Sequence, residues 1–274
     1  MFGAIDVGGT KTLLGSFNSK GNLIESVKFE TPRDYNSFID LLKENSTKIN
    51  LSNLKVITIA IPGLIDVNKG IAKELGNLPW ENIPVRKDIE KIYKCPVFVQ
   101  NDTKLAGLYE SIIVKPHYRK VLYVTVSTGI GGALIIDNKI DKDFENMEVG
   151  HMLFEHNGQL IRWEKFASGK AIVAKFGKPA SEITDAKDWY IIAHNIAIGL
   201  IDLIATLTPD IIVIGGGVGS HFDKFGDRLI EDLKIYQNRL LTIPPVVMAI
   251  NAEQAVIYGC YYYGKSQYEL ATTQ

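Results

Sequence analysis

The sequence of 274 residues contains little cysteine and no excess of charge of either sign. The two cysteines, Cys95 and Cys260, lack CxxC spacing, which argues against a zinc knuckle or a disulfide framework. With 30 basic and 31 acidic residues the formal net charge is −1, so no nucleic-acid partner is expected. No apolar run reaches the roughly 18–20 residues that span a bilayer, and residues 1–15 lack a secretory signal. We therefore expect a protein of the reducing cytoplasm with no membrane partner.

Two glycine-rich turns lie between apolar, β-branched segments, a pattern typical of β-hairpins. The first turn is Gly8–Lys11 and the second is Thr128–Gly132. A dinucleotide-binding Rossmann motif needs a helix directly after its glycines, so the hairpins exclude it. Glycines still let backbone N–H groups approach an anion closely. The turns are therefore candidate phosphate sites, with ordinary tight hairpins as the alternative.

The two halves of the sequence resemble each other, which predicts a duplicated α/β unit. Residues 6–14 align with residues 127–135, Val56–Gly63 with Ile211–Val218, and Val97–Glu110 with Val247–Cys260. Proline in the segment 115–117 stops a helix, so we place the first domain at 1–116 and the second at 117–274. The last helix, predicted over 252–264, is free to pack back on the first domain. We also expect helices within 34–49 and over 188–207, and a loop around Trp80.

Two aspartates follow predicted strands, and each has two interpretations. Asp6 lies beside the first glycine turn, where a carboxylate suits Mg²⁺ held through water or simply caps the turn. Lys11 either contacts phosphate or points to solvent. Asp102 follows a strand and begins a helix, so it can accept a proton, cap the helix, or do both. The duplicated position of Asp102 is Ala252, so two facing domains would form a cleft with one reactive side.

Six motifs occur in a fixed order along the chain: Asp6-x-Gly-Gly-Thr-Lys, Asn101-Asp102, Thr128-Gly-Ile-Gly-Gly, Glu148-x-Gly150-His151, Glu164 followed by Ala167-Ser168-Gly169, and Gly215-Gly216-Gly217-Val218. The ordered set resembles the ROK family of sugar kinases and related repressors, within the actin-like ATPase superfamily. The resemblance runs from about residue 3 to residue 260. It implies two ribonuclease-H-like α/β domains with an interdomain cleft.

The resemblance also implies a role for each matching residue. The catalytic base matches Asp102, and the sugar-hydroxyl contacts match Asn101, Glu148, His151 and Glu164. The loop from Asn77 to Trp80 matches one that borders the sugar. The ATP-binding motifs match Asp6, Gly8, Gly9, Thr10 and Lys11 for the first phosphate site, Thr128, Gly129, Gly131 and Gly132 for the second, and Gly215, Gly216 and Gly217 for adenosine.

Two departures from the family pattern concern metal and substrate. Members commonly carry a cysteine-rich zinc motif after the histidine, but residues 152–163 contain no cysteine, so we predict no zinc. That segment is instead expected to be held by packing of Leu153, Phe154, Leu160 and Trp163. The family often has asparagine two residues after the catalytic aspartate, where this sequence has Lys104. This difference leaves the exact sugar open.

The leading hypothesis is an ATP- and Mg²⁺-dependent hexokinase of the glucokinase type that phosphorylates the 6-hydroxyl of glucose. Alternatives in the same family are fructo-, manno- or N-acetylhexosamine kinases. A sugar-sensing repressor would need a DNA-binding domain ahead of the first phosphate motif, and five residues precede Asp6. The sugar residues also argue against an actin-like assembly or chaperone ATPase. The resemblance further implies a homodimer.

Overall fold

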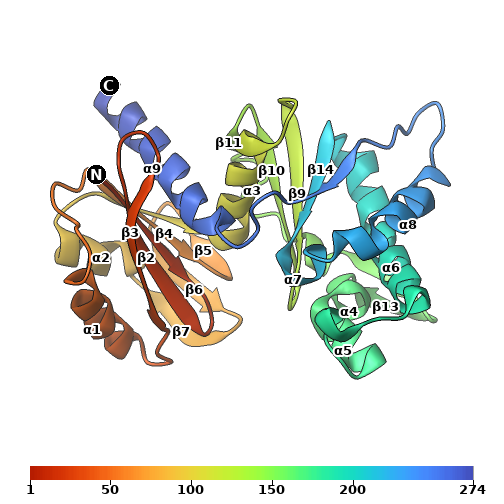
Figure 1. Cartoon of the computed structure of the whole chain (residues 1–274), viewed down its shortest axis with the longest axis horizontal. Helices are drawn as coiled ribbons and strands as arrows, with labels where there is room; N and C mark the ends of the chain where they lie inside the picture. The colour runs from red at the N-terminus through yellow and green to blue at the C-terminus, as the bar shows by residue number, and fades with distance from the viewer. Residues whose placement is uncertain (274) are drawn as a thin grey trace. The chain divides into compact units, whose positions relative to one another are not determined.

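The computed structural model describes residues 1–273, which form two compact units (Figure 1). The first unit comprises residues 1–109 together with the segment that begins at Glu253, and the second comprises Glu110–Ala252. The chain first passes from one unit to the other within helix α3 (Asp102–Ile113), ahead of the proline segment at 115–117. The helix is continuous there, so no local break in the sequence marks the change.

A five-stranded mixed sheet forms the centre of the first unit. Its order is β3-β2-β1-β4-β8, in which β1 pairs antiparallel with β2 and parallel with β4. The strands are β1 (Phe2–Val7), β2 (Lys11–Phe17), β3 (Leu23–Glu30), β4 (Val56–Ile61) and β8 (Val97–Asn101). Side chains alternate between the faces of the sheet, so Ile5 and Ile59 face one side and Ala4 and Ala60 the other.

Helices cover both faces of this sheet. Apolar residues of α1 (Tyr35–Ser46) and α2 (Val85–Tyr93) pack in the same cluster as Ile5 and Ile59. The long helix α9 (Ala255–Thr273) lies on the other face, where Ile257 and Tyr261 pack with Ala4 and Ala60 (Figure 1). The C-terminal helix therefore completes the core of the first unit.

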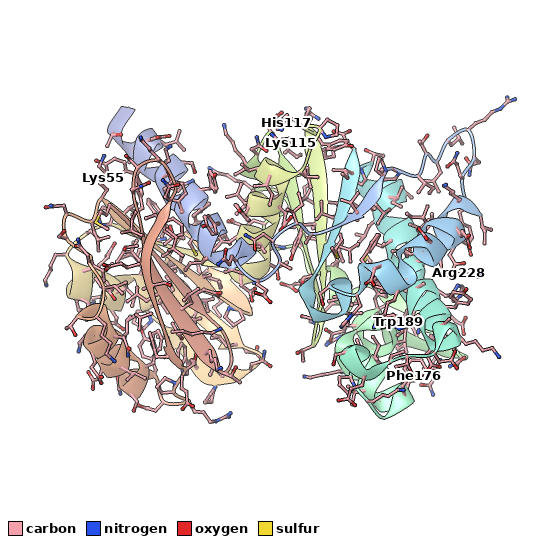
Figure 2. All side chains as sticks on the ribbon, viewed as in Figure 1. Lys55, Lys115, His117, Phe176, Trp189 and Arg228 are labelled. Carbon is pink, nitrogen blue, oxygen red and sulfur yellow. The ribbon has the colours of Figure 1, made fainter. Side chains whose placement is uncertain are left out.

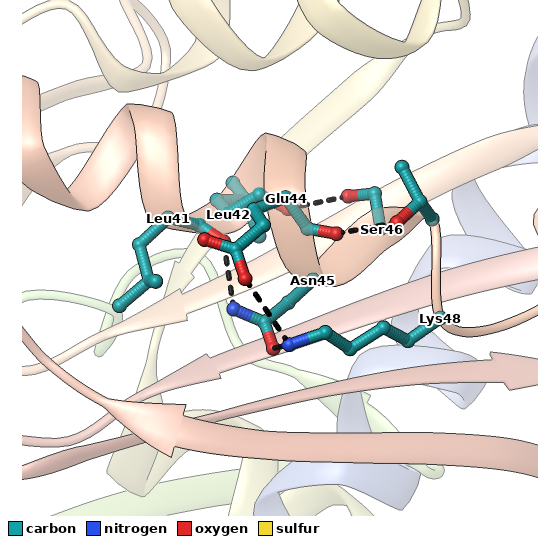
Figure 3. Close-up of polar contacts among 7 residues, drawn as sticks. Leu41, Leu42, Glu44, Asn45, Ser46 and Lys48 are labelled. Carbon is teal, nitrogen blue, oxygen red and sulfur yellow. Dashed lines mark hydrogen bonds and ion pairs between the residues drawn. The ribbon is translucent and has the colours of Figure 1, made fainter.

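The C-terminal end of α1 is held by side chains that accept or donate within its last turns (Figure 3). The Asn45 amide donates to the Leu41 carbonyl at 2.8 Å, and its Oδ1 accepts from Lys48 Nζ at 3.0 Å. The Ser46 hydroxyl donates to the Leu42 carbonyl at 2.6 Å. The Asn45 and Ser46 side chains therefore add bonds to carbonyls inside the helix. The carbonyls of Glu44 and Asn45, which the helix end would leave without partners, accept from the backbone N–H groups of Thr47 and Lys48 at 3.2 and 3.1 Å.

A second, three-stranded sheet in the first unit corrects the loop expected around Trp80. It consists of β5 (Leu64–Asp66), β6 (Ile71–Leu75) and β7 (Leu78–Ile83), in that order. Pro79 is tolerated in β7 because this is an edge strand. Trp80 is 2% exposed, and its indole N–H donates to the Arg33 carbonyl at 2.8 Å. The residues therefore form a packed strand.

The second unit repeats the sheet of the first. Its order is β11-β10-β9-β14-β15, with β9–β10 antiparallel and β9–β14 and β14–β15 parallel. The strands are β9 (Lys120–Val126), β10 (Ile130–Ile136), β11 (Lys139–Ile140), β14 (Ile211–Gly215) and β15 (Val246–Met248). The shared topology confirms the duplicated α/β unit predicted from the sequence.

Two long helices, α6 (Ala186–Leu207) and α8 (Phe222–Lys234), form the core of the second unit with this sheet. The Trp189 side chain (labelled in Figure 2) stacks on Phe225 with ring centroids 5.8 Å apart. By length and composition, α6 is the one helix within residues 1–273 that could cross a membrane, and half of its apolar stretch is buried in the unit. It is therefore explained as a core helix.

The segment after His151 forms a small hairpin of β12 (Leu153–His156) and β13 (Gln159–Arg162). Phe154 packs on the core cluster and Trp163 is fully buried, as expected. Leu153 and Leu160 are 57% and 67% exposed, so their expected packing is wrong. The reason is strand alternation: Leu153 and Leu160 share the outward face of the hairpin.

The shorter elements of the second unit are η1 (Val149–His151), α4 (Glu164–Ala167), α5 (Gly169–Phe176), η2 (Ala180–Glu182) and α7 (Gly216–Gly219).

Candidate functional site

The first glycine turn is a tight connection between β1 and β2 in the first unit. The Gly8 N–H donates to the Lys11 carbonyl at 3.0 Å, and a Cβ on Gly8 would lie 2.9 Å from that oxygen. A Cβ on Gly9 would lie 2.8 Å from the Cβ of Asn77. Glycine is therefore required at both positions, and the turn lies against the loop that the resemblance places beside the sugar. Thr10 and Lys11 are exposed at this turn.

Asp6 lies one residue before the end of β1, on the same face as Ala4 and Ala60. Burial and, second, the nearby Asp102 carboxylate together raise the pKa of its carboxyl from 3.8 to about 7, against the opposing charge of Lys28. A divalent cation bound near Asp6 and Asp102 would offset the repulsion between their two carboxylates. Within residues 1–273 no three His, Cys, Asp or Glu residues form a metal-holding group. Mg²⁺ at Asp6 would therefore take its other ligands from water and phosphate, as this ion prefers.

The start of α3 separates the capping role from the catalytic candidate. The Asn101 Oδ1 accepts from the backbone N–H of Thr103 at 3.0 Å and of Lys104 at 3.3 Å, and its amide donates to the Gly63 carbonyl at 3.2 Å. Asn101 is thus the residue that caps the helix. Asp102 Oδ1 accepts from the Thr103 N–H at 2.7 Å and from its hydroxyl at 3.3 Å.

Burial dominates the electrostatics of Asp102 and raises the pKa of its carboxyl. The hydrogen bonds from Thr103 and the charge of Lys104 act in the opposite direction. Lys104, the residue that departs from the family pattern, is only 3% exposed. A raised pKa makes the Asp102 carboxylate a stronger base than an ordinary aspartate, which suits it to accept a proton.

The second glycine turn, in the second unit, is shorter than the sequence indicates. Ser127 N–H donates to the Gly129 carbonyl at 2.9 Å, and β10 already begins at Ile130. Gly131 and Gly132 therefore belong to the strand, paired with residues 125 and 124 of β9. The turn of the hairpin thus ends at Gly129. Gly132 is required for a different reason, close packing, because its Cβ would lie 2.9 Å from Val149.

A pair of predicted sugar residues meets beside this turn. His151 Nε2 lies 3.9 Å from Glu164 Oε1, with the side chains 51% and 23% exposed. The other carboxylate oxygen of Glu164 lies 3.0 Å from the position of a Cβ on Gly129. A Cβ on Gly150 would lie 2.2 Å from the Ile130 carbonyl, so only glycine lets η1 approach β10 this closely.

Glu148, the third sugar residue predicted in this unit, directly precedes η1, and its side chain is exposed. Its backbone carbonyl accepts from the His151 N–H at 3.0 Å. The structure thus brings His151 and Glu164 together at the second phosphate turn and places Glu148 at the start of the same short helix.

The third glycine run ends β14 and begins α7. Cβ atoms on Gly215 and Gly216 would lie 2.3 Å from Tyr123 Oη and 2.5 Å from Thr125 Oγ1, and Gly216 has φ of +84°. No atom lies within 4 Å of the Cβ position of Gly217, which borders a pocket of about 520 Å³. The same pocket is bordered by Thr128. One cavity therefore connects the second phosphate turn with the glycine run that the resemblance assigns to adenosine.

The sequence analysis missed several residues of these sites. Lys170 and His221 also line the pocket, and Lys28 acts on the Asp6 carboxyl. For Lys170 a signal was present, because it directly follows the Ser168-Gly169 motif. No signal in the sequence marks Lys28, whose influence depends on the pairing of β1, β2 and β3.

Comparison with known proteins agrees with this organisation. Residues 2–266 match the sequence profile of the ROK family. The N-acetylmannosamine kinase of Vibrio vulnificus is 33% identical over 246 residues, covering 79% of this chain and 82% of that protein. The glucokinase of Streptomyces coelicolor is 24% identical over 274 residues, covering 84% and 86%.

Solved structures show the same fold. A ROK family glucokinase from Streptomyces griseus, in complex with glucose and AMPPNP, superposes with a TM-score of 0.78 at 20% identity, covering 96% of this chain and 98% of that one. The profile match spans nearly the whole chain and the fold is that of the actin-like ATPases. The protein is therefore a member of the ROK family.

Proposed function

We propose that this protein transfers the γ-phosphoryl group of ATP to a hydroxyl group of a hexose, at the 6-position. The observation that carries the proposal is the environment of Asp102. Its carboxyl is buried enough to have a raised pKa, and the neighbouring Asn101 performs the helix capping. A carboxylate in this state is a suitable acceptor for the hydroxyl proton.

In the proposed reaction the sugar oxygen forms a bond to the γ-phosphorus while the bond from that phosphorus to the ADP oxygen breaks. The hydroxyl proton passes to the Asp102 carboxylate and is later released to water. Phosphoryl transfer depends mainly on positioning and on neutralising charge. Lys11 and the backbone of the glycine turns would hold the phosphates. Mg²⁺, held near Asp6, would neutralise phosphate charge.

The sugar would be oriented by His151 and Glu164, with Glu148 and Asn101 as further contacts. Sugar hydroxyls both donate and accept, so a carboxylate beside an imidazole can bind two of them at defined angles. Each charge-assisted bond contributes about 1.5–3 kcal/mol. The Asn101 side chain already bonds to the backbone at both its oxygen and its nitrogen, which leaves one amide hydrogen for the sugar.

Glucose is the first candidate substrate, and N-acetylmannosamine is the second. The 33% identity to the Vibrio vulnificus enzyme favours the second candidate over fructose or mannose. Lys104 is the residue at which this chain departs from the family pattern, so it is the position where a difference in sugar preference is expected.

The test is a panel of hexoses and acetamido sugars incubated with ATP and Mg²⁺, with ADP release and sugar phosphate both measured. We expect sugar-dependent ADP release and a product phosphorylated at the 6-hydroxyl. ATP hydrolysis that is independent of every sugar would contradict the proposal and favour an actin-like assembly ATPase.

Two variants sharpen this test. Glu164→Gln should weaken sugar binding by about tenfold or more and leave ATP binding unchanged, because one charged acceptor is lost. Glu231→Gln is the matched control, since Glu231 is an exposed residue of α8 in the same unit. Equal losses of sugar and ATP binding in Glu164→Gln would instead indicate disturbed folding of the unit.

We further propose that the protein acts in the cytoplasm as a homodimer. The family resemblance supports the homodimer, and the cytoplasmic location follows the expectation drawn from the sequence. Light scattering coupled to size-exclusion chromatography tests the dimer directly, because a monomeric mass of 30.4 kDa would contradict it.

A further inference from the structure

The pocket of the second unit has an apolar wall and a single cation at its phosphate end. Val173, Pro179, Ala180 and Val218 line it, and these side chains have no groups that bind phosphate. Lys170, the second residue of α5, also lines the pocket and is exposed there. An apolar compartment of about 520 Å³ suits a planar base, whereas the phosphates of a nucleotide need positive charge.

The backbone at the start of α5 cannot supply that charge. Its first N–H groups already donate within the fold: Gly169 to the Ser127 carbonyl at 2.6 Å, Lys170 to the Thr128 carbonyl at 3.4 Å, and Ala171 to the Ser168 hydroxyl at 3.3 Å. A helix start binds an anion through N–H groups that have no other partner. At this position the phosphate-binding capacity therefore belongs to a side chain.

The same bonds fix where that side chain begins. The contact between the Lys170 N–H and the Thr128 carbonyl ties the lysine backbone to the second phosphate turn. The Ser168 hydroxyl caps the helix and holds its first turn in place. The lysine side chain therefore starts from a fixed point beside the turn, at the border of the pocket.

We propose that Lys170 binds the α- and β-phosphates of the nucleotide donor, while the apolar part of the pocket holds the base. This inference deepens the proposed function, on which it rests, by assigning a donor-binding residue outside the glycine motifs. A nucleoside triphosphate makes use of both parts of the pocket, whereas inorganic polyphosphate makes use of the cation alone.

The test measures binding of ATP, ADP and adenosine to the full-length protein and to Lys170→Met by calorimetry. Loss of one charge-assisted contact should weaken ATP and ADP binding about tenfold to a hundredfold and leave adenosine binding unchanged. Lys175→Met is the matched control, because Lys175 is an exposed lysine of the same helix that does not line the pocket. The control should bind all three ligands as the parent protein does.

Two results would overturn the inference: unchanged ATP affinity in Lys170→Met, or an equal loss of adenosine affinity, which would mean that the pocket itself had collapsed. The outcome can be separated from that of the proposed function. Lys170-dependent ATP binding without transfer to any sugar would contradict only the kinase activity. Sugar phosphorylation by ATP in the parent protein, together with unchanged ATP affinity in Lys170→Met, would contradict only the role of Lys170.

Discussion

Replacing Asp6 by asparagine should stabilise the first unit, and the gain should grow with pH. Asn keeps the shape of the side chain and cannot ionise. The pKa of Asp6 is raised from 3.8 to about 7, so the folded state binds more protons than the unfolded state between these values. Stability is therefore lost as pH rises from about 4 to about 7, and at higher pH the full penalty remains.

The size of the effect follows from the shift. Each pKa unit corresponds to about 1.4 kcal/mol, so ionised Asp6 costs about 4 kcal/mol at pH 8. At pH 5 the folded state is still protonated and only the unfolded state has ionised, which reduces the cost to about 1.7 kcal/mol. Asp6→Asn should accordingly gain about 2–3 kcal/mol more at pH 8 than at pH 5. Solvent contact of the partly buried carboxyl makes these values upper limits.

Hydrogen exchange of β1 and β4 amides, read by mass spectrometry with metal chelated, measures this free energy within the first unit. Asp40→Asn serves as a control, because its side chain is 77% exposed and its ion pair with Lys43 contributes little. The gain from Asp6→Asn should shrink in an Asp102→Asn background, since Asp102 is the second cause of the shift. A gain that is equal at pH 5 and pH 8 would refute the reasoning.

Four further predictions concern catalysis, metal and sugar binding. Asp102→Asn should keep sugar binding and lose about 10²–10⁴-fold in turnover; near-normal turnover would leave Asp102 without a role as base. Because the base must be ionised and burial raises the pKa of Asp102, turnover of the parent protein should fall on acidification at a pH above the ordinary carboxyl range, as a pH profile of kcat would reveal. Chelation should abolish activity and Mg²⁺ should restore it, whereas elemental analysis of untagged protein should find no zinc; near-stoichiometric zinc would overturn the assignment of His151 as a free sugar ligand. Gly150→Ala should raise the KM for sugar more than that for ATP, because its Cβ would lie 2.2 Å from the Ile130 carbonyl and displace η1; unchanged sugar KM would show that this contact is not needed.

Segments with a strong local pattern could be predicted from the sequence. Every residue of Val56–Ile61 is apolar or β-branched, and the observed β4 has the same bounds. In Leu23–Glu30 apolar and polar residues alternate poorly and several residues are charged, so the pattern does not predict a strand. The segment nevertheless forms β3, the edge strand of the first sheet. Pro79 and Pro84 suggest a loop, and only pairing with β6 makes β7 a strand.

The candidate site divides in a similar way. Ordered motifs identify the glycine turns. The sequence cannot decide which of two adjacent residues caps a helix when both residue types favour that role. Only the structure shows that Asn101, and not Asp102, caps α3. Repulsion between Asp6 and Asp102, and the placement of Lys170 along the pocket, depend on contacts between segments far apart in the chain. Such contacts follow from the packing of the whole unit.

The position of α9 has a consequence for biosynthesis. The first unit receives its last helix from residues after Glu253, so its core is built from both ends of the chain. Until that helix leaves the ribosome, the sheet face bearing Phe2, Ala4 and Phe17 has no Ile257 and Tyr261 to cover it. The second unit, Glu110–Ala252, is contiguous and complete earlier in translation. The second unit should thus finish folding before the first, although most of the first unit is synthesised earlier. The N-terminal sheet of the nascent chain should therefore be the part that needs chaperones.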